Sequence, residues 1–302
     1  MLRKLVVNAD DLGLTVGINK GIFDAHHEGI VTSASMMANA SATSDAISRL
    51  RSHPSLGIGA HLVLVDGVPM LPPHRIPSLV DGDERFRSSW RSFIVASLRG
   101  RVSLNEVESE LTAQIDRIRS EGIRLTHLDA HEHVHAFPPL FEVVVRLAAR
   151  FHIPVVRVPY ERWSWSPVWG DRQQRCKVWC QALANAAMGP WARRDVRLAG
   201  AHGVDTPELV GRIHTGVMSA DSLAGMIRRL RPGVAELMVH PGYVDDALGR
   251  HHTRLLSSRA AEVDLLCSRS VADLVLNEDI ELVRHDLGSS DTLLPRSFRG
   301  AS

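Results

Sequence analysis

Short apolar, β-branched runs alternate along this chain with longer segments of helical period, and this alternation constrains the fold most strongly. A strand-like run followed by a helix is typical of βα units around a parallel sheet. In the segment 103–120, for example, Val107, Leu111, Ile115 and Ile118 recur at helical spacing and form one apolar stripe. Seven or eight such units predict an α/β fold, a TIM-like (β/α) barrel that is either complete or incomplete.

The expected elements and insertions divide the chain as follows. Strands are expected near residues 3–9, 31–37, 57–64, 123–129, 154–158, 198–201, 234–239 and 280–284, and helices near 17–28, 42–51, 103–120, 138–150, 173–187, 221–230 and 257–268. Residues 1–288 are expected to form one domain with long insertions near 65–100 and 161–195. The first insertion, rich in Pro, Gly and Arg, is typical of a lid or binding wall. Residues 289–302 show little pattern and predict a flexible tail.

Composition excludes several classes of protein. With 44% hydrophobic residues and a net charge of +1, the chain is expected to bury a large core and to have no nucleic-acid partner. Cys176, Cys180 and Cys267 match neither a disulfide framework nor a zinc motif, which favours a reducing compartment. The first apolar run breaks at Asn8, too early for a signal peptide or a membrane span. We expect a cytoplasmic protein, with peripheral membrane contact left open.

Carboxylate and imidazole side chains gather where predicted strands end. Asp10 and Asp11 close the first strand, whereas His61 and His131 lie at the ends of two others. A catalytic metal needs about three protein ligands and one open position, and Asp11, His61 and His131 fit this need. On an ideal strand the two aspartates would face opposite ways, so both reach one pocket only if the strand bends at Gly13. A helix-capping or turn role is the alternative for the aspartates alone.

The His-rich segment that contains His131 offers further candidates. A period of two places His127, Asp129 and His131 on one face of an extended segment. His127 would lie deeper in the barrel, as a partner oriented by Asp129. His133 and His135 follow the strand end, where they are expected to line a substrate groove.

Several blocks of this sequence resemble, in order, the YdjC-like carbohydrate deacetylases over roughly residues 3–275. These blocks are Val7–Gly13, Gly29–Ala34, Gly57–Leu62, residues 126–135 and Met238–Tyr243. Three further stretches, His61–Gly67, Leu71–Pro73 and Arg157–Glu161, resemble the branch associated with hopanoid biosynthesis. The resemblance implies a barrel that removes the acetyl group from an N-acetylglucosaminyl hopanoid and releases acetate. The chain departs from the family at Ala130, where Ser or Asn is usual, so a polar contact from that position is not expected.

The resemblance also implies roles for individual residues. Asp11 would bind the metal and Asp10 would act as the general base. His240 closes a predicted strand, and it either protonates the departing amine or packs at the barrel mouth. Arg157 either pairs with a pocket carboxylate or forms a surface or structural salt bridge. Tyr243 is expected near the substrate.

The cofactor and the substrate are less sharply defined. One divalent ion is expected, and an aspartate with two histidines suits Zn²⁺, Ni²⁺ or Co²⁺ better than Mg²⁺, which prefers more oxygen donors. Such an ion would lower the pKa of a bound water molecule and polarise the acetamide. The alternatives are deacetylation of soluble chito-oligosaccharides, hydrolysis of a phosphate ester, and binding of a sugar or lipid without catalysis.

Five of the six tryptophans fall in or near the second insertion. They are Trp163, Trp165, Trp169, Trp179 and Trp191. Residues 162–197 also carry seven basic residues against two acidic ones, a local net charge of +5. Trp and Arg favour membrane interfaces, which predicts contact with a bilayer or with the apolar part of a glycolipid substrate. Packing of these tryptophans against the barrel, or against a partner subunit in a homodimer, is the alternative.

Overall fold

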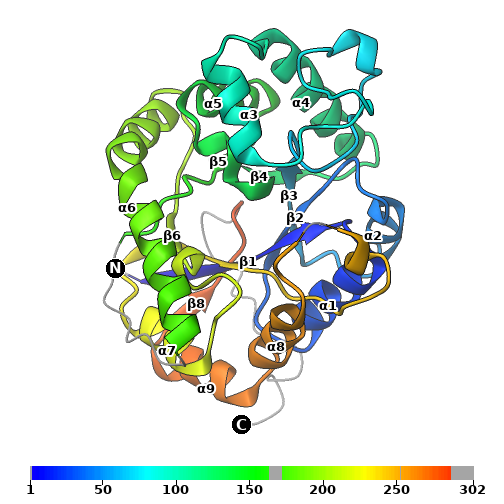
Figure 1. The fold of residues 1–302 in the computed structure, drawn as a ribbon. Coiled ribbons are helices and arrows are strands. Elements are labelled where there is room, and N and C mark those ends of the chain that lie inside the picture. The colour runs from blue at the N-terminus through cyan, green and yellow to red at the C-terminus, as the bar shows by residue number, and fades with distance from the viewer. Residues whose placement is uncertain (1, 163–171, 252, 287–302) are drawn as a thin grey trace.

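A parallel sheet forms the centre of the protein in this computed structural model, which describes residues 2–162, 172–251 and 253–286 (Figure 1). Its strands are β1 Arg3–Leu12, β2 Ser33–Met36, β3 Gly57–Leu62, β4 Leu125–Ala130, β5 Val155–Val156, β6 Glu208–Val210, β7 Gly233–Val239 and β8 Ile280–Leu282. The α-helices are α1 Val16–His27, α2 Thr43–Leu50, α3 Trp90–Leu98, α4 Leu104–Arg119, α5 Pro138–Phe151, α6 Arg172–Ala201, α7 Ala220–Arg228, α8 Ser257–Leu266 and α9 Arg269–Asn277. Short 3-10 helices within these described residues are η1 Pro73–Arg75, η2 His131–Ala136, η3 Arg212–His214 and η4 Leu248–Arg250.

The strands follow the order β5-β4-β3-β2-β1-β7-β6, and β8 pairs with the first residues of β1. The two ends of this path approach each other through isolated parallel bridges, from Val155 to Asp205 and from Glu161 to Leu209. The sheet is therefore curled and barrel-like, and helices surround it (Figure 1). This architecture confirms the predicted α/β class.

Helix α4 illustrates how local sequence produces these elements. The Ser103 side chain accepts a hydrogen bond from the backbone N–H of Glu106, which caps the first turn. The predicted stripe, from Val107 to Ile118, is buried against the sheet. Gly122, with a φ of 78°, follows the helix, and a positive φ of this kind suits glycine where a chain turns.

The observed elements depart from the expected ones in four places. The strand expected near 198–201 is the last turn of α6, because Ala192, Asp195 and Ala199 continue a buried stripe at helical spacing. The true strand is β6, three residues long, which was not predicted. The segment 65–100, expected to be a loop, contains the helix α3, whereas the helix expected near 173–187 is found and extends further, as α6. Helix α9 was not predicted as a separate element.

Some expectations concern residues that the structure leaves undescribed. The predicted tail at 289–302 and the three tryptophans Trp163, Trp165 and Trp169 lie outside the described residues. Among the helices that are described, none combines the length and the apolar character needed to cross a membrane.

Candidate metal centre

The strand β1 bends at the paired aspartates, as the sequence predicts. Asp11 has a φ of 70°, and the pairing of β1 with β2 shifts its register between Ala9 and Leu12. A positive φ is uncommon for residues other than glycine and is often found at functional sites. Asp10 and Asp11 are both buried at this carboxyl end of the strand, and a ligand atom of each lies within 4.8 Å of one of His61.

Three predicted ligands lie together at this end of the sheet. The Oδ1 atom of Asp11 is 3.2 Å from Nδ1 of His131 and 3.4 Å from Nε2 of His61. One ligand atom from each residue lies within 4.8 Å of the other two. The His131 side chain keeps 20% of its surface exposed, whereas those of Asp11 and His61 keep 4% and 3%. The cluster is therefore open on the His131 side, where a substrate and a water molecule could enter.

Partners outside the cluster orient its ligand atoms. Asp129 accepts a hydrogen bond from Nδ1 of His61 at 2.8 Å, which leaves Nε2 directed at Asp11. Arg259 on α8 contacts Oδ2 of Asp11 at 2.5 Å, which leaves Oδ1 facing both histidines. A carboxylate that holds the far nitrogen of a ligating histidine is a common feature of protein metal sites. The donor set and its orientation therefore fit one divalent ion.

The electrostatics of the cluster also favour a cation. Burial opposes a charge on His61, yet the charge of Asp129 and hydrogen bonds to Asp11 and Asp129 raise the pKa of His61 to about 10. Burial likewise opposes the charge of Asp11, but Arg259 and the two histidines hold the pKa of its carboxyl well below the usual range. The cluster thus attracts positive charge, and a metal ion would compete with the proton on His61.

Arg157 forms the centre of a buried charge network next to the cluster. Its guanidinium contacts both oxygens of Asp10, at 2.6 and 2.7 Å, and also reaches Asp129 at 2.9 Å and Glu236 at 2.5 Å. Arg157 therefore pairs with buried carboxylates and not with a residue on the surface. Asp10, His61 and Asp129 form a second group with the spacing of metal ligands. Arg157 already binds both carboxylates of this group, whereas Oδ1 of Asp11 faces the two histidines, so the group with Asp11 is the better cation site.

His240 lies on the other side of Asp10. Its Nε2 atom is 3.9 Å from Oδ2 of Asp10, and its backbone N–H donates to Glu262 on α8 at 2.6 Å. Burial, assisted by Arg259 and Arg157, outweighs the neighbouring carboxylates and lowers the pKa of His240 to about 4. The imidazole is therefore neutral near pH 7.

The other predicted residues are arranged differently from expectation. His127 contacts the hydroxyls of Ser35 and Thr126, so Asp129 does not orient it directly. Ser35 instead donates to Asp129 at 2.7 Å and links the two residues. Burial lowers the pKa of His127 to about 4, which keeps this deeper histidine neutral.

Two histidines and a tyrosine complete the comparison with the sequence. His135 is buried and contacts the backbone oxygen of Arg157 at 2.9 Å. It therefore packs against the segment that carries Arg157 and does not line a groove. His133 is half-buried with a φ of 53° and has a buried Nδ1 without a hydrogen-bond partner among the described residues. The Tyr243 hydroxyl donates to Asp24 on α1 at 3.0 Å, and this places it apart from the metal cluster.

Sequence reasoning missed three charged residues of this centre, namely Arg259, Glu236 and Glu262. Glu236 had a usable signal, because it is the one charged residue within the otherwise apolar strand β7. Arg259 and Glu262 lie on a helix far along the chain, where nothing in the local pattern separates them from surface residues. Only the packing of α8 against α1 brings this helix to the end of β1.

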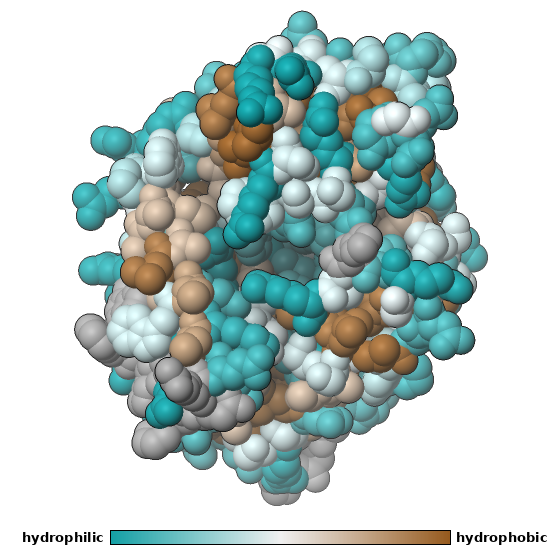
Figure 2. Space-filling model, viewed as in Figure 1, coloured by the Kyte–Doolittle hydropathy of each residue, from teal (hydrophilic) through white to brown (hydrophobic). Residues whose placement is uncertain are grey.

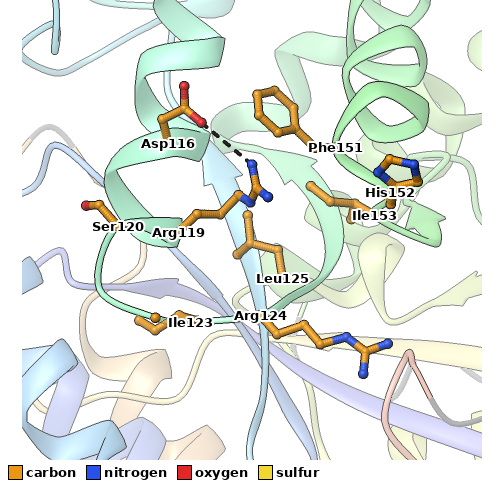
Figure 3. A pocket seen from close by; sticks show the side chains of 10 residues that line it. Asp116, Arg119, Ser120, Ile123, Arg124, Leu125, Phe151, His152 and Ile153 are labelled. Atoms are coloured by element: carbon orange, nitrogen blue, oxygen red, sulfur yellow. Dashed lines mark ion pairs between the residues drawn. The ribbon is translucent and has the colours of Figure 1, made fainter.

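A pocket of about 750 Å³ lies at the opposite end of the sheet (Figure 3). It is lined by the end of α4, the start of β4 and the residues that follow α5, including an ion pair between Asp116 and Arg119 at 3.7 Å. None of the candidate metal ligands lines it. We therefore place the chemistry at the carboxyl ends of the strands, where ligands bind in parallel α/β sheets.

The curled parallel sheet defines a barrel-like α/β protein. The side chains of Asp11, His61 and His131 at the ends of its strands form a candidate metal centre. Residues 4–277 match the sequence profile of the family described as YdjC-like protein, so the chain belongs to the YdjC-like family.

Similar proteins cover nearly the whole chain. A carbohydrate deacetylase from Brevibacillus brevis is 31% identical over 283 residues, which is 93% of this chain and 97% of that protein. Another, from Halalkalibacterium halodurans, is 32% identical over 280 residues, or 93% and 100% of the two chains. A crystal structure from Enterococcus faecalis, of a protein described as a candidate for cellobiose-phosphate cleavage, superposes with a TM-score of 0.76. That protein is 26% identical, with 95% of this chain and 98% of that chain covered.

Proposed function

We propose that this protein is a metal-dependent carbohydrate N-deacetylase, acting on an N-acetylglucosamine-type sugar. The observation that carries the proposal is the group Asp11, His61 and His131 beside the Arg157-bound carboxylate of Asp10. Metal ligands next to a separate carboxylate are what amide hydrolysis needs, because one group activates the amide and the other accepts a proton. The similarity to carbohydrate deacetylases over nearly the whole chain supports the same reaction.

Asp10 is positioned to accept the proton of the attacking water. A bound divalent ion would supply the electrophile that activates this water and the acetamide. Arg157 and Asn8 occupy Oδ1 of Asp10, whereas Oδ2 receives one hydrogen bond from Arg157. A carboxylate oxygen accepts two hydrogen bonds, so Oδ2 keeps a free position on the side of His240.

His240 then carries the proton to the leaving nitrogen. Because it is neutral near pH 7, it can act as an acid only after Asp10 has received the proton of the water. The 3.9 Å between Oδ2 of Asp10 and Nε2 of His240 is close enough for transfer after a small movement. One proton of the water reaches the leaving nitrogen as the C–N bond breaks, which gives the free amine and acetic acid. The acid then releases its own proton to the solvent near pH 7 and leaves as acetate.

We propose a lipid-linked sugar, N-acetylglucosaminyl hopanoid, as the substrate, and the cytoplasm as the location. The three stretches that resemble the hopanoid branch support this choice, and so do exposed apolar side chains on α6 such as Leu183, which is 69% exposed. Short chito-oligosaccharides are the competing substrate.

Acetate release by the metal-loaded protein tests the proposal. The glycolipid, chito-oligosaccharides and an aryl phosphate ester should be assayed side by side, with a chelator-treated sample and its metal content measured in parallel. We expect acetate release that needs about one ion per chain, fastest with the glycolipid. Acetate release that survives complete removal of metal would refute the metal-dependent mechanism, and phosphate release alone would indicate a phosphoesterase.

A further inference from the structure

The helix α6 buries only a narrow stripe of its surface. In its first half Val178, Ala182 and Asn185 face the protein, and Asn185 bonds both the backbone N–H and the C=O of Glu161, which follows β5. Since β5 pairs with β4, whose end carries His131, this anchors α6 beside the strands that hold the metal centre. Gln181 is partly buried and donates to the backbone oxygen of Thr215 at 3.2 Å, and the other described residues of this half are exposed.

The outer face of this half is apolar. Cys176, Cys180, Leu183 and Ala187 recur at i, i+4, i+7 and i+11, the spacing of one helix face, and all four are exposed. Two large aromatic side chains flank this face, and Trp179 and Trp191 are 49% and 50% exposed. Figure 2 shows the result as an apolar ridge along α6 at the edge of the molecule. We name these six residues the α6 ridge.

Basic side chains stand at both ends of the ridge. Residues 173–201 contain five basic residues and one acid, Asp195, which is buried. Arg194 pairs with Glu142 on α5. In the described part of the chain, the other four, Arg175, Lys177, Arg193 and Arg197, form no ion pair.

This charge pattern discriminates between possible partners. A second copy of the chain, docked ridge to ridge, would bring two strongly basic helices together without acidic residues to offset them. An anionic phospholipid surface would accept the same charges favourably, while the tryptophans and Leu183 enter the headgroup boundary. Charge complementarity therefore favours a lipid surface over self-association.

We infer that the α6 ridge docks the protein on an anionic phospholipid bilayer, with the helix lying in the plane of the interface. This inference goes beyond the proposed deacetylation and does not require it. Each basic side chain near such a surface increases the membrane–water partition coefficient about five-fold, so four of them increase it several hundred-fold at low salt.

Flotation of the full-length, metal-loaded protein with vesicles tests the inference. Vesicles of phosphatidylcholine with 30% phosphatidylglycerol should be compared with pure phosphatidylcholine, in the presence of a reductant that keeps Cys176 and Cys180 as thiols. We expect flotation only with the anionic vesicles, and release at high salt. The variant Trp179→Ser/Leu183→Ser should reduce the floated fraction at least ten-fold.

A matched control makes the same chemical change elsewhere. Trp90→Ser/Leu98→Ser replaces two exposed apolar side chains on α3, 42% and 73% exposed, and should float like the wild type. Equal flotation of the α6 and α3 variants, or no flotation of the wild type, would overturn the inference. A stable dimer that Leu183→Ser dissociates would also overturn it, in favour of self-association.

The deacetylation proposal is tested separately on the same samples. Acetate release from a water-soluble N-acetylated sugar should be the same for the wild type and Trp179→Ser/Leu183→Ser. A protein that floats but releases no acetate contradicts only the proposed function, whereas one that releases acetate but never floats contradicts only the docking.

Discussion

Replacing Arg157 should destabilise the fold strongly, and by an amount that depends on pH. The side chain is 1% exposed and touches three carboxylates, those of Asp10, Asp129 and Glu236. Arg157→Met keeps much of the apolar volume but removes the guanidinium that all three share. Removing one partner from a buried ion pair costs about 3–5 kcal/mol, because the remaining charge stays buried and uncompensated.

The loss should be largest above pH 7. Burial, offset in part by Arg157, already raises the pKa of Glu236 to about 7, so this carboxyl can take up a proton in the folded state. Without Arg157, whose charge holds this pKa down, the folded-state pKa of Glu236 rises further. A raised carboxyl pKa means that stability is lost as the pH rises through it, so the deficit should shrink between pH 8 and pH 5.5. At pH 8 we expect a melting temperature lowered by about 10 °C.

Urea unfolding in the presence of a chelator measures this free energy without interference from metal binding. Arg146→Met is a matched control, because Arg146 pairs with Glu108 and Glu142 on the surface and should cost less than about 1 kcal/mol. The double variant Arg157→Met/Glu236→Gln should recover part of the loss by removing one unpaired carboxylate. If Arg157→Met unfolds within 1 kcal/mol of the wild type at pH 8, the buried network contributes little and the reasoning is refuted.

Three further predictions concern the metal ligands, the base and a second buried carboxyl. His61→Ala and His131→Ala should each lose the bound metal and the activity while keeping the far-UV circular dichroism of the wild type; full metal occupancy in both would contradict the assignment. Asp10→Asn should keep the metal and release acetate about 10²–10⁴-fold more slowly. If Asp10→Asn instead loses the metal while Asp11→Asn keeps it, the roles of base and metal ligand must be exchanged. Burial raises the pKa of Glu161 to about 7, so the wild type should lose up to about 3 kcal/mol of stability relative to Glu161→Gln between pH 5 and pH 8; parallel pH profiles in urea unfolding would contradict this.

Local sequence patterns predicted most of the elements and the residues that the structure brings together as candidate metal ligands. The strands β1 and β7 are found where their apolar runs lie, since a strand buried on both faces shows as a continuous run. Asp11, His61 and His131 could be predicted because each closes such a run, and parallel strands bring their carboxyl ends to one edge. The strand β6 could not be predicted, because three residues are too few to show a period.

The sequence by itself determined the class of fold, the family and the side chains that could bind a metal, because these depend on local periodicity and on residues at strand ends. Tertiary structure alone decided how those side chains are oriented and charged. The contacts from Asp129 to His61, from Arg157 to Asp10 and from Arg259 to Asp11 join residues 68, 147 and 248 positions apart. No local pattern encodes such pairings, because they arise only when the sheet curls and brings distant strands and a C-terminal helix to one edge.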